Sequence, residues 1–352
     1  MIISRTPFRI SFFGGGTDYP GWYRENGGAV LSTSIDKYCY LTCRYLPPFF
    51  EHRYRVVYSK MENCNAIDEI AHPAVRGVLR HLGWERGLEI HHDADLPARS
   101  GMGSSSSFTV GLLHALHGLR GEMRSKAQLL DEALHVEQEL LRETVGSQDQ
   151  AAAAHGGLNT FVFEQTGEIV ARRLILSAER MAELESHLML FYSGIKRTAS
   201  DVAESFVPSI AEKRIQLGRF RAMVDEGAAI LSAGRPLREF GALLDEAWRL
   251  KRGLSALVSN ADVDGMYAAA LGAGAWGGKL LGAGGGGFVL IFAPPERRAA
   301  VREALRGHIH VPFHMESSGS QIIFYDPEQE YHEAEAERAS GAHRAFREMR
   351  SP

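Results

Sequence analysis

One run of glycine and serine constrains the fold of this chain more than any other feature. It reads Pro97-Ala98-Arg99-Ser100-Gly101-Met102-Gly103-Ser104-Ser105-Ser106-Ser107. A strand-like stretch from Leu88 to His92 comes before it, and apolar residues at helical spacing follow it from Phe108 to Leu119. The pattern predicts a strand, a tight loop and an amphipathic helix that begins near Ser104.

The predicted loop has the composition of a phosphate site. Glycines let several backbone N–H groups converge on one anion, and the start of a helix adds partial positive charge. Serine hydroxyls can donate to phosphate oxygens or bind Mg²⁺. The run matches neither Gly-x-Gly-x-x-Gly nor the loop that ends in Gly-Lys-Ser/Thr. The alternative is a plain serine N-cap after a glycine turn.

Strand and helix patterns alternate irregularly along the rest of the chain. This mixture favours an α+β fold with two lobes, 1–185 and 186–330, followed by a charged tail, 331–352. The predicted strands are 8–13, 29–35, 39–45, 54–58, 158–163, 168–174, 188–192, 288–292 and 321–325. The predicted helices are 74–82, 125–144 (with Ser125 and Gln128 as a capping box), several across 199–257, and 295–306.

Composition excludes several classes of protein. The 352 residues are 45% hydrophobic and 23% charged, with a net charge of −4, which argues against a nucleic-acid or polybasic membrane-surface protein. The start of the chain lacks the apolar core of a signal peptide, and the apolar run 288–293 is too short to span a bilayer. Three cysteines imply no disulfide framework, and we expect buried thiols and a cytoplasmic protein.

Glu137 is the first carboxylate whose predicted position suggests a function. Leu130, Ala133, Glu137 and Leu141 share one face of the predicted helix 125–144, so Glu137 projects from an apolar stripe. A buried carboxylate is costly unless it is paired or binds a metal ion. The alternative is a boundary position whose carboxylate meets water or an arginine.

Asp149 is the second carboxylate with a candidate function. It lies in Gly146-Ser147-Gln148-Asp149-Gln150, and Ser147 is predicted to cap a short helix that starts there. In a first turn the helix dipole favours an ionised carboxylate, which suits a group that accepts or orients a hydroxyl proton. The alternative is an acid that only complements the dipole.

Three runs together resemble the GHMP kinases, named for galactokinase, homoserine kinase, mevalonate kinase and phosphomevalonate kinase. The first motif runs from Pro7-Phe8-Arg9 to Gly14-Gly15-Gly16-Thr17-Asp18-Tyr19-Pro20. The second is the glycine–serine run. The third is Lys279-Leu-Leu-Gly282-Ala283-Gly284-Gly285-Gly286-Gly287-Phe288. The likeness covers nearly the whole chain and ends near residue 326.

The resemblance implies a ribosomal protein S5 domain 2-like N-terminal lobe and a ferredoxin-like C-terminal lobe. It implies ATP and Mg²⁺ as cofactors, Ser105 and Glu137 as metal ligands, and Asp149 with Arg9 as the catalytic pair. The implied ATP-binding residues are Arg99, Ser100, Gly101, Met102, Gly103, Ser104, Ser105 and Ser106. The implied substrate-binding residues are Gly15, Gly16, Thr17, Asp18, Gln148, Gly284 and Gly285.

One difference from the galactokinase motif narrows the range of expected substrates. Galactokinases carry Glu-His where this chain has Gly15-Gly16, and the triple-glycine form looks like the bacterial D-glycero-D-manno-heptose 7-phosphate kinases and related fucokinase domains. That branch phosphorylates the anomeric 1-hydroxyl, which here would give a 1,7-bisphosphate for activated heptose in lipopolysaccharide or capsule. Lys196 and Arg197 are predicted to bind the substrate phosphate, with Arg99 and Lys279 as weaker candidates. Surface charge is the alternative for Lys196 and Arg197.

Other functions stay open at this stage. The partner is expected to be a small sugar phosphate, with no nucleic acid and no membrane, and the protein a monomer or homodimer. Rival readings are a kinase for an unphosphorylated sugar such as fucose, a non-catalytic sugar sensor on the same fold, a decarboxylase of a phosphorylated acid and a dinucleotide-dependent oxidoreductase. A sensor should lack Ser105, Glu137 or Asp149, and an oxidoreductase should have a Gly-x-Gly-x-x-Gly unit.

Overall fold

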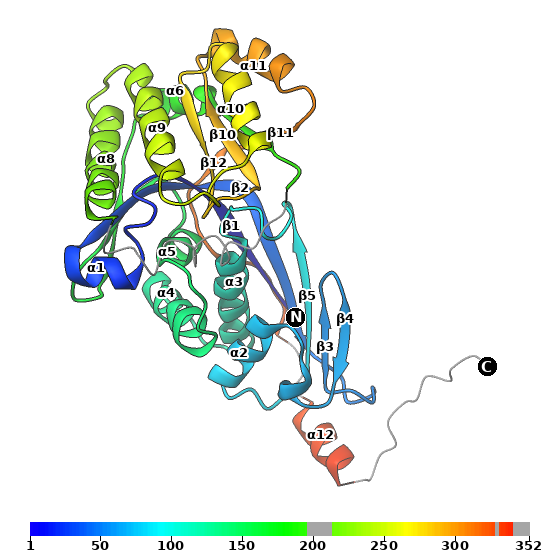
Figure 1. Cartoon of the computed structure of the whole chain (residues 1–352). Coiled ribbons are helices and arrows are strands. Elements are labelled where there is room, and N and C mark those ends of the chain that lie inside the picture. The colour runs from blue at the N-terminus through cyan, green and yellow to red at the C-terminus, as the bar shows by residue number, and fades with distance from the viewer. Residues whose placement is uncertain (196–212, 328–330, 341–352) are drawn as a thin grey trace.

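The computed structural model describes residues 1–195, 213–327 and 331–340. Its strands form a sheet of nine and a sheet of four, each covered by helices (Figure 1). The α+β architecture with two lobes is therefore confirmed. Among the described residues, no helix is both long enough and apolar enough to cross a bilayer.

The first sheet is built around two long antiparallel strands, β1 (Ile2–Phe13) and β2 (Gly28–Tyr45). Its main order is β13-β1-β2-β5-β3-β4, and β6 and β12 also pair with β2. The remaining strands are β3 (Tyr54–Val57), β4 (Met61–Cys64), β5 (Leu88–Ala94), β6 (Asn159–Phe163), β7 (Ile169–Arg173), β12 (Met315–Glu316) and β13 (Gln321–Tyr325).

The prediction of separate strands 29–35 and 39–45 was wrong, because β2 continues through both. Its register against β1 shifts between the pairs Phe8–Ile35 and Pro7–Tyr38, which leaves Asp36 and Lys37 in a bulge. The two polar residues thus interrupt the pairing without ending the strand. All three cysteines are buried and free, as expected.

Helices cover the first sheet on the side that carries the candidate residues. They are α1 (Pro20–Asn26), α2 (Pro73–His81), α3 (Ser104–Leu119), α4 (Lys126–Leu134) and α5 (Gln148–His155), with a 3₁₀ turn at Ile67–Glu69. The capping box of Ser125 and Gln128 is confirmed. The predicted helix 125–144 ends early: α4 passes into a π-helix, His135–Leu140, and Arg142 takes a left-handed conformation.

The second sheet has the antiparallel order β11-β8-β10-β9. If β8, β9, β10 and β11 are numbered 1 to 4 in chain order, their order across the sheet is 4-1-3-2. This is the strand order of a ferredoxin-like lobe. Its strands are β8 (Leu188–Tyr192), β9 (Gly277–Leu280), β10 (Phe288–Phe292) and β11 (Ile309–Val311). Its helices are α6 (Ala178–His187), α8 (Arg214–Ser232), α9 (Leu237–Arg252), α10 (Ala261–Gly272) and α11 (Arg298–Ala304), with a 3₁₀ turn at Pro295–Arg297.

Aromatic packing joins the two sheets. The ring of Phe240 on α9 lies 5.4 Å from that of Phe12 and 5.0 Å from that of Phe13 on β1, and 5.4 Å from that of Phe292 on β10. These residues are almost fully buried. The end of β1 is therefore fixed against the second lobe by a continuous core.

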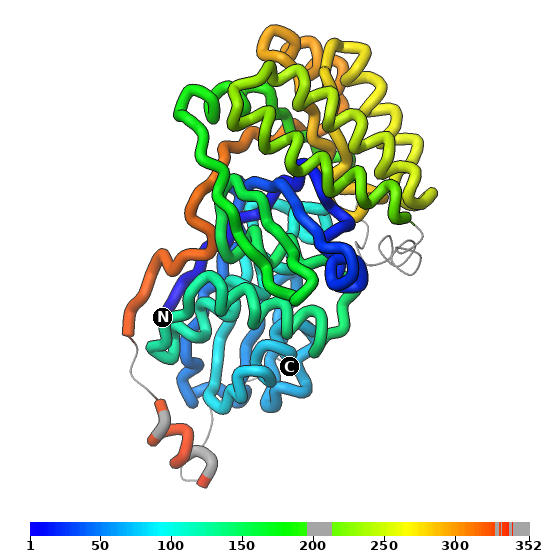
Figure 2. Tube along the Cα trace, turned by 90° about the vertical axis from the view of Figure 1, so that its left-hand side faces the viewer, coloured from blue at the N-terminus to red at the C-terminus, as the bar shows by residue number. Residues whose placement is uncertain are grey.

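The chain returns to the first sheet after β11. Figure 2 shows the orange segment running back beside the blue N-terminal strand, where β13 pairs with β1 and β12 with β2. The division at 185, 330 and 331 stays a prediction, although 315–325 belong to the first sheet. The helix α12 (His332–Ala339) lies in the predicted charged tail.

Candidate active site

An arginine–aspartate pair lies at the centre of the candidate site. Arg9 on β1 donates from Nε to Asp149 Oδ1 at 2.7 Å and from Nη2 to Oδ2 at 2.8 Å. Its third nitrogen, Nη1, donates to the Gly101 carbonyl at 2.6 Å. The Arg9 side chain is 5% exposed and that of Asp149 is 27% exposed. The structure thus holds a rigid, partly accessible carboxylate next to the glycine–serine loop.

The loop turns through two left-handed glycines, Gly101 (φ +80°) and Gly103 (φ +75°). Gly103 is the N-cap of α3, and no side chain caps the helix. The alternative of a plain serine N-cap is therefore wrong, and the first amides of a 16-residue helix are left for a ligand. A Cβ on Gly103 would lie 3.3–3.4 Å from atoms of Arg9 and Asp149, so the loop and the pair form one site.

The third glycine motif packs directly on this loop. A Cβ on Gly282 would lie 2.5 Å from Gly101 Cα, and one on Gly287 would lie 2.2 Å from the Ser100 carbonyl. The Phe288 amide donates to that same carbonyl at 3.2 Å. We call this contact between 100–101 and 282–288 the glycine seam. It joins the two lobes at the base of the site.

Glu137 is fully buried, as its place on an apolar stripe predicted. Its Oε2 accepts hydrogen bonds from Ser106 Oγ at 2.9 Å and from Gln150 Nε2. Its Oε1 has no partner of hydrogen-bond geometry, although the Thr109 side chain lies close enough to lower the pKa of Glu137. Burial raises the pKa of Glu137 to about 7. The bond to the serine run comes from Ser106, while the predicted partner Ser105 is exposed. Both are in the first turn of α3.

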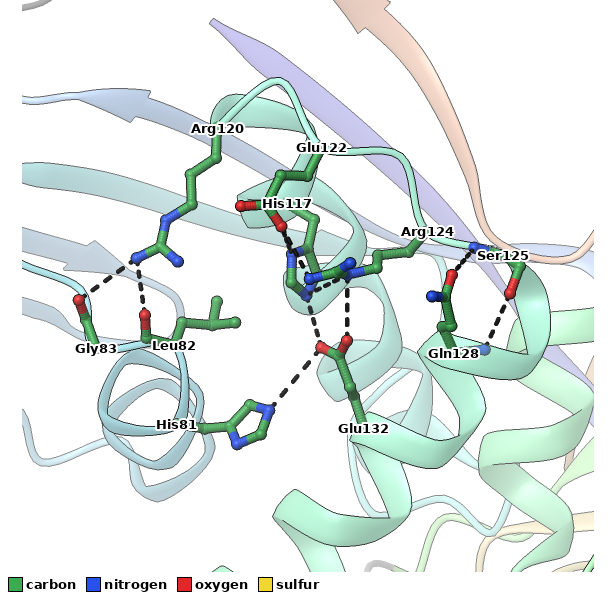
Figure 3. A network of polar contacts seen from close by, with 10 residues as sticks. All are labelled: His81, Leu82, Gly83, His117, Arg120, Glu122, Arg124, Ser125, Gln128 and Glu132. Carbon is green, nitrogen blue, oxygen red and sulfur yellow. Dashed lines mark hydrogen bonds and ion pairs between the residues drawn. The ribbon is translucent and has the colours of Figure 1, made fainter.

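The π-helix gives Glu137 its position. A π turn widens the helix by one residue and is often found at functional sites. Here it follows α4, which is fastened to the far end of α3 by the polar network of Figure 3. His117 on α3 lies between two carboxylates, with Nε2 2.6 Å from Glu132 and Nδ1 3.0 Å from Glu122. The helices that carry the serine run and Glu137 are therefore tied together.

We predict that His117→Ala destabilises the protein by about 3 kcal/mol, because it leaves Glu122 and Glu132 without their buried partner. His117 is 2% exposed. Without it, Glu122 would keep Arg124, and Glu132 would keep Arg124 and the more distant His81, 3.9 Å away. Urea unfolding of both proteins measures the difference. His135→Ala removes an exposed contact with Glu139 and should cost less than about 0.5 kcal/mol. Equal costs would contradict the role of the network.

Thr17 and Asp18 hold the first motif in shape. The carbonyls of Gly14 and Ala29 both lie within hydrogen-bond distance of the Thr17 hydroxyl, which can donate its one hydrogen to either and accepts from the Ala29 amide, so it stabilises the turn. Asp18 accepts from the Gly16 amide at 2.8 Å and from the Gln148 amide at 3.3 Å. Burial raises the pKa of Asp18. These residues connect the first motif to the loop before α5.

Gly15 faces two buried polar groups without partners. A Cβ on Gly15 would lie 3.6 Å from Gln148 Nε2 and 3.8 Å from Ser11 Oγ. Neither Ser11 Oγ nor Gln148 Oε1 has a hydrogen-bond partner. Sequence reasoning missed Ser11, although it shares a strand face with Arg9 two residues before it. Gly16 is left-handed (φ +103°) and lies against Leu217 of α8.

Several other predicted site residues contact the protein's own backbone or core. Gly285 donates its amide to the Val258 carbonyl at 2.9 Å, and its own carbonyl accepts from Asn260. Gly284 also packs on Val258. Met102 is a core side chain whose carbonyl accepts from the Arg9 amide at 3.1 Å.

Ser147 stands at the N-cap of α5, as predicted. Its hydroxyl makes no capping hydrogen bond and contacts Gln138 and Tyr23 instead. Asp149 still lies in the first turn, as predicted. Arg99 is exposed and left-handed (φ +59°), and its amide donates to Ser104 Oγ at 3.3 Å. Ser100 is buried, and its hydroxyl has no partner. Lys196 and Arg197 lie outside the described residues.

Sequence reasoning missed Lys251 at the end of α9. Its Nζ donates to the carbonyls of Leu280 and Gly282, which brings it to the glycine seam. Leu237, Phe240, Leu244 and Trp248 are buried along the same helix, and Lys251 continues their spacing. A charged residue on an apolar stripe was the signal, as it was for Glu137.

Two family models match the chain. "GHMP kinases N terminal domain" covers residues 69–157, and "GHMP kinases C terminal" covers 228–310. The first match contains the glycine–serine loop, Glu137 and Asp149. The second contains Lys251, Lys279 and the seam residues 282–288.

Known proteins of this kind align over most of the chain. A D-glycero-alpha-D-manno-heptose 7-phosphate kinase of Campylobacter jejuni is 28% identical over 87% of this chain and 93% of its own length. A mevalonate kinase of Methanothermobacter thermautotrophicus is 31% identical over 62% of this chain and 71% of its own length. The crystal structure of a D-glycero-D-manno-heptose 1-phosphate kinase from Bacteroides thetaiotaomicron superposes with a TM-score of 0.77 at 23% identity, over 93% of this chain and all of that one. The chain belongs to the GHMP kinase family, phosphotransferases that act on an alcohol group.

Proposed function

We propose that this kinase transfers the γ-phosphate of ATP to the anomeric C1 hydroxyl of D-glycero-D-manno-heptose 7-phosphate. The observation that carries this proposal is the Arg9–Asp149 pair held against the uncapped start of α3. Such a site can receive a phosphate at the helix amides and a hydroxyl at the carboxylate. The product would be the 1,7-bisphosphate, an intermediate toward activated heptose.

The loop residues fit a nucleotide, and the carboxylate fits a divalent cation. Uncapped amides after two left-handed glycines suit phosphate oxygens. A buried carboxylate oxygen without a partner, beside serine hydroxyls, is an oxygen donor set of the kind that Mg²⁺ prefers. We propose Glu137 as a ligand, with Ser105 or Ser106 supplying the hydroxyl. Bound there, Mg²⁺ would neutralise phosphate charge.

The described residues can perform the remaining work of phosphoryl transfer. That reaction depends on alignment and charge neutralisation more than on a strong base. Asp149 would accept a hydrogen bond from the acceptor hydroxyl and hold it in line with the phosphate. Arg9 keeps both carboxylate oxygens fixed, and its contact with the Gly101 carbonyl sets the distance between hydroxyl and loop.

Gly101→Ala should weaken ATP binding by about 10-fold or more, which corresponds to 1.4 kcal/mol. A Cβ there would lie 2.6 Å from the Leu281 carbonyl, and φ is +80°, so the loop must move. The measurement is the Kd of ATP by calorimetry. Gly121→Ala is a matched control, because Gly121 has φ +76° but nothing within 4 Å. An unchanged Kd in Gly101→Ala would contradict the assigned phosphate loop.

The substrate is supported by the first motif. Gly15 leaves room beside Ser11 and Gln148, whose free polar atoms suit the hydroxyls of a sugar. The similar Campylobacter protein is named for heptose 7-phosphate. Fucose or another unphosphorylated sugar is the second candidate, favoured by the same Gly15 and Gly16. The predicted cytoplasmic location, the Lys196 and Arg197 phosphate site and the monomeric or dimeric state stay predictions.

ADP release with Mg-ATP across a panel of acceptors tests the proposal. The panel holds D-glycero-D-manno-heptose 7-phosphate, mannose 6-phosphate, fucose, galactose and mevalonate. We expect the highest kcat/KM with the heptose phosphate. Turnover of fucose alone would contradict the heptose phosphate as the substrate but would support the assignment as a sugar kinase. Silence with every acceptor would contradict the proposed substrate and favour a sugar sensor.

A further inference from the structure

Lys279, which is buried, and Lys251, which is partly buried, place two ammonium groups beside the glycine seam. Lys279 on β9 is 7% exposed, and its Nζ donates to the Phe12 carbonyl at 2.9 Å. Lys251 Nζ donates to the Leu280 carbonyl at 3.0 Å and to that of Gly282. One lysine thus reaches the end of β1, three residues after Arg9, and the other reaches the glycine that packs on Gly101.

These charges are not neutralised by ion pairs. In the part of the chain that the structure describes, each ammonium donates to carbonyl oxygens and to no carboxylate, and Lys251 Nζ also lies 6.0 Å from the centre of the Trp248 ring. Arg9 is a third cation nearby, and its carboxylate partner, Asp149, is already engaged by two hydrogen bonds. Asp18 is the carboxylate that acts on Lys279, and burial raises the pKa of Asp18. The site therefore has an excess of positive charge.

Burying that charge is costly. Burial lowers the pKa of Lys279 to about 7, and the nearby Arg9 adds to the effect. Burial also lowers the pKa of Lys251 well below its ordinary value, with Lys279 and Arg9 contributing. Carbonyl contacts alone do not repay the desolvation of two like charges. An anion bound between them and the loop would.

We propose that Lys251 and Lys279 form a subsite that binds phosphate oxygens at the glycine seam. The inference rests on the proposed phosphoryl transfer and deepens it. The phosphate has two sources with the same chemistry: the γ-phosphate of the nucleotide, which the loop would hold beside Gly101, or the phosphate of a sugar phosphate. Both lysines lie in the second lobe, whereas Arg9 and Asp149 lie in the first, so this subsite completes the site from the opposite side.

Calorimetry on Lys251→Met, Lys279→Met and the double variant tests the subsite. The ligands are AMP-PNP, ADP, heptose 7-phosphate and the same heptose without phosphate. Losing a hydrogen bond to a charged group should weaken the affected ligand by about 10- to 100-fold. Loss for AMP-PNP but not ADP identifies the γ-phosphate, and loss for heptose 7-phosphate but not heptose identifies the sugar phosphate. Both outcomes support the subsite, and Lys279→Arg should restore part of the affinity.

Melting temperatures separate a subsite from a structural clamp. Without ligand, Lys279→Met should melt at or above the wild-type temperature, because an uncompensated buried charge is removed. Lys126→Met is a matched control, since Lys126 Nζ also donates to two carbonyls, those of His155 and Ser318, away from the seam. It should leave every ligand constant unchanged. Unchanged constants in the double variant, with a lower melting temperature, would overturn the proposal.

The subsite and the proposed function can fail separately. If the wild type phosphorylates no sugar phosphate, the proposed substrate fails, but AMP-PNP and inorganic phosphate still test the lysines. Inorganic phosphate should raise the melting temperature of the wild type more than that of the double variant. An equal increase, together with equal Kd values for AMP-PNP, would overturn the subsite whatever the substrate is.

Discussion

Asp149→Asn should lower kcat by about 1,000-fold and leave the Kd of ATP within about threefold, a change of less than 1 kcal/mol. Arg9 donates to both carboxylate oxygens, and an amide would set an N–H group against one of these donors. The variant therefore loses both the acceptor for the substrate hydroxyl and the fixed geometry. Steady-state kinetics and calorimetry measure the two quantities.

Glu179→Gln is the matched control for this variant. Glu179 is also a first-turn acid, on α6, and contacts no residue of the site. Its substitution should leave kcat and the Kd of ATP unchanged. A near-normal kcat in Asp149→Asn would refute the role of Asp149 and leave it as an acid that complements the helix dipole.

Glu137→Gln should abolish most Mg²⁺-dependent activity while making the metal-free protein more stable. The pKa of Glu137 is about 7 in the folded protein and 4.5 in its reference state, so the folded state binds the proton more tightly. Stability of the metal-free protein therefore falls as pH rises from 4.5 to 7. Above pH 7 the buried charge costs about 3 kcal/mol, which the glutamine removes.

Unfolding at pH 8 with and without Mg²⁺ measures this second prediction. Mg²⁺ should stabilise the wild type and leave Glu137→Gln unaffected. Glu139→Gln serves as a control, because Glu139 lies in the same π-helix but has an exposed carboxylate that contacts His135. A wild-type Mg²⁺ titration in Glu137→Gln would contradict the proposed ligand.

Local patterns were sufficient for the elements and for the carboxylates. The strands 188–192, 288–292 and 321–325 have the bounds that their composition predicted. Glu137 is buried because the apolar stripe around it is. The same pattern could not show the π-helix, which depends on packing and changes the spacing after residue 134.

Local sequence patterns could not predict the contacts between residues far apart in the chain. Arg9 and Asp149 lie 140 residues apart, and their pairing was expected only from the resemblance to a family. Nothing local marks Ser106 rather than Ser105 as the partner of Glu137, since the choice depends on how α3 is rotated against the π-helix. Thr17 stays a predicted substrate-binding residue, and the pattern did not show that its hydroxyl also bonds to the turn at Gly14 and Ala29.

Phosphorus NMR of the product formed from ATP and D-glycero-D-manno-heptose 7-phosphate tests the central claim most directly. The account predicts a second phosphorus signal on the sugar, coupled to the anomeric proton, while the original phosphate stays in place. A new phosphate on any other hydroxyl would contradict the assigned acceptor, and the absence of a bisphosphate would contradict the assigned substrate.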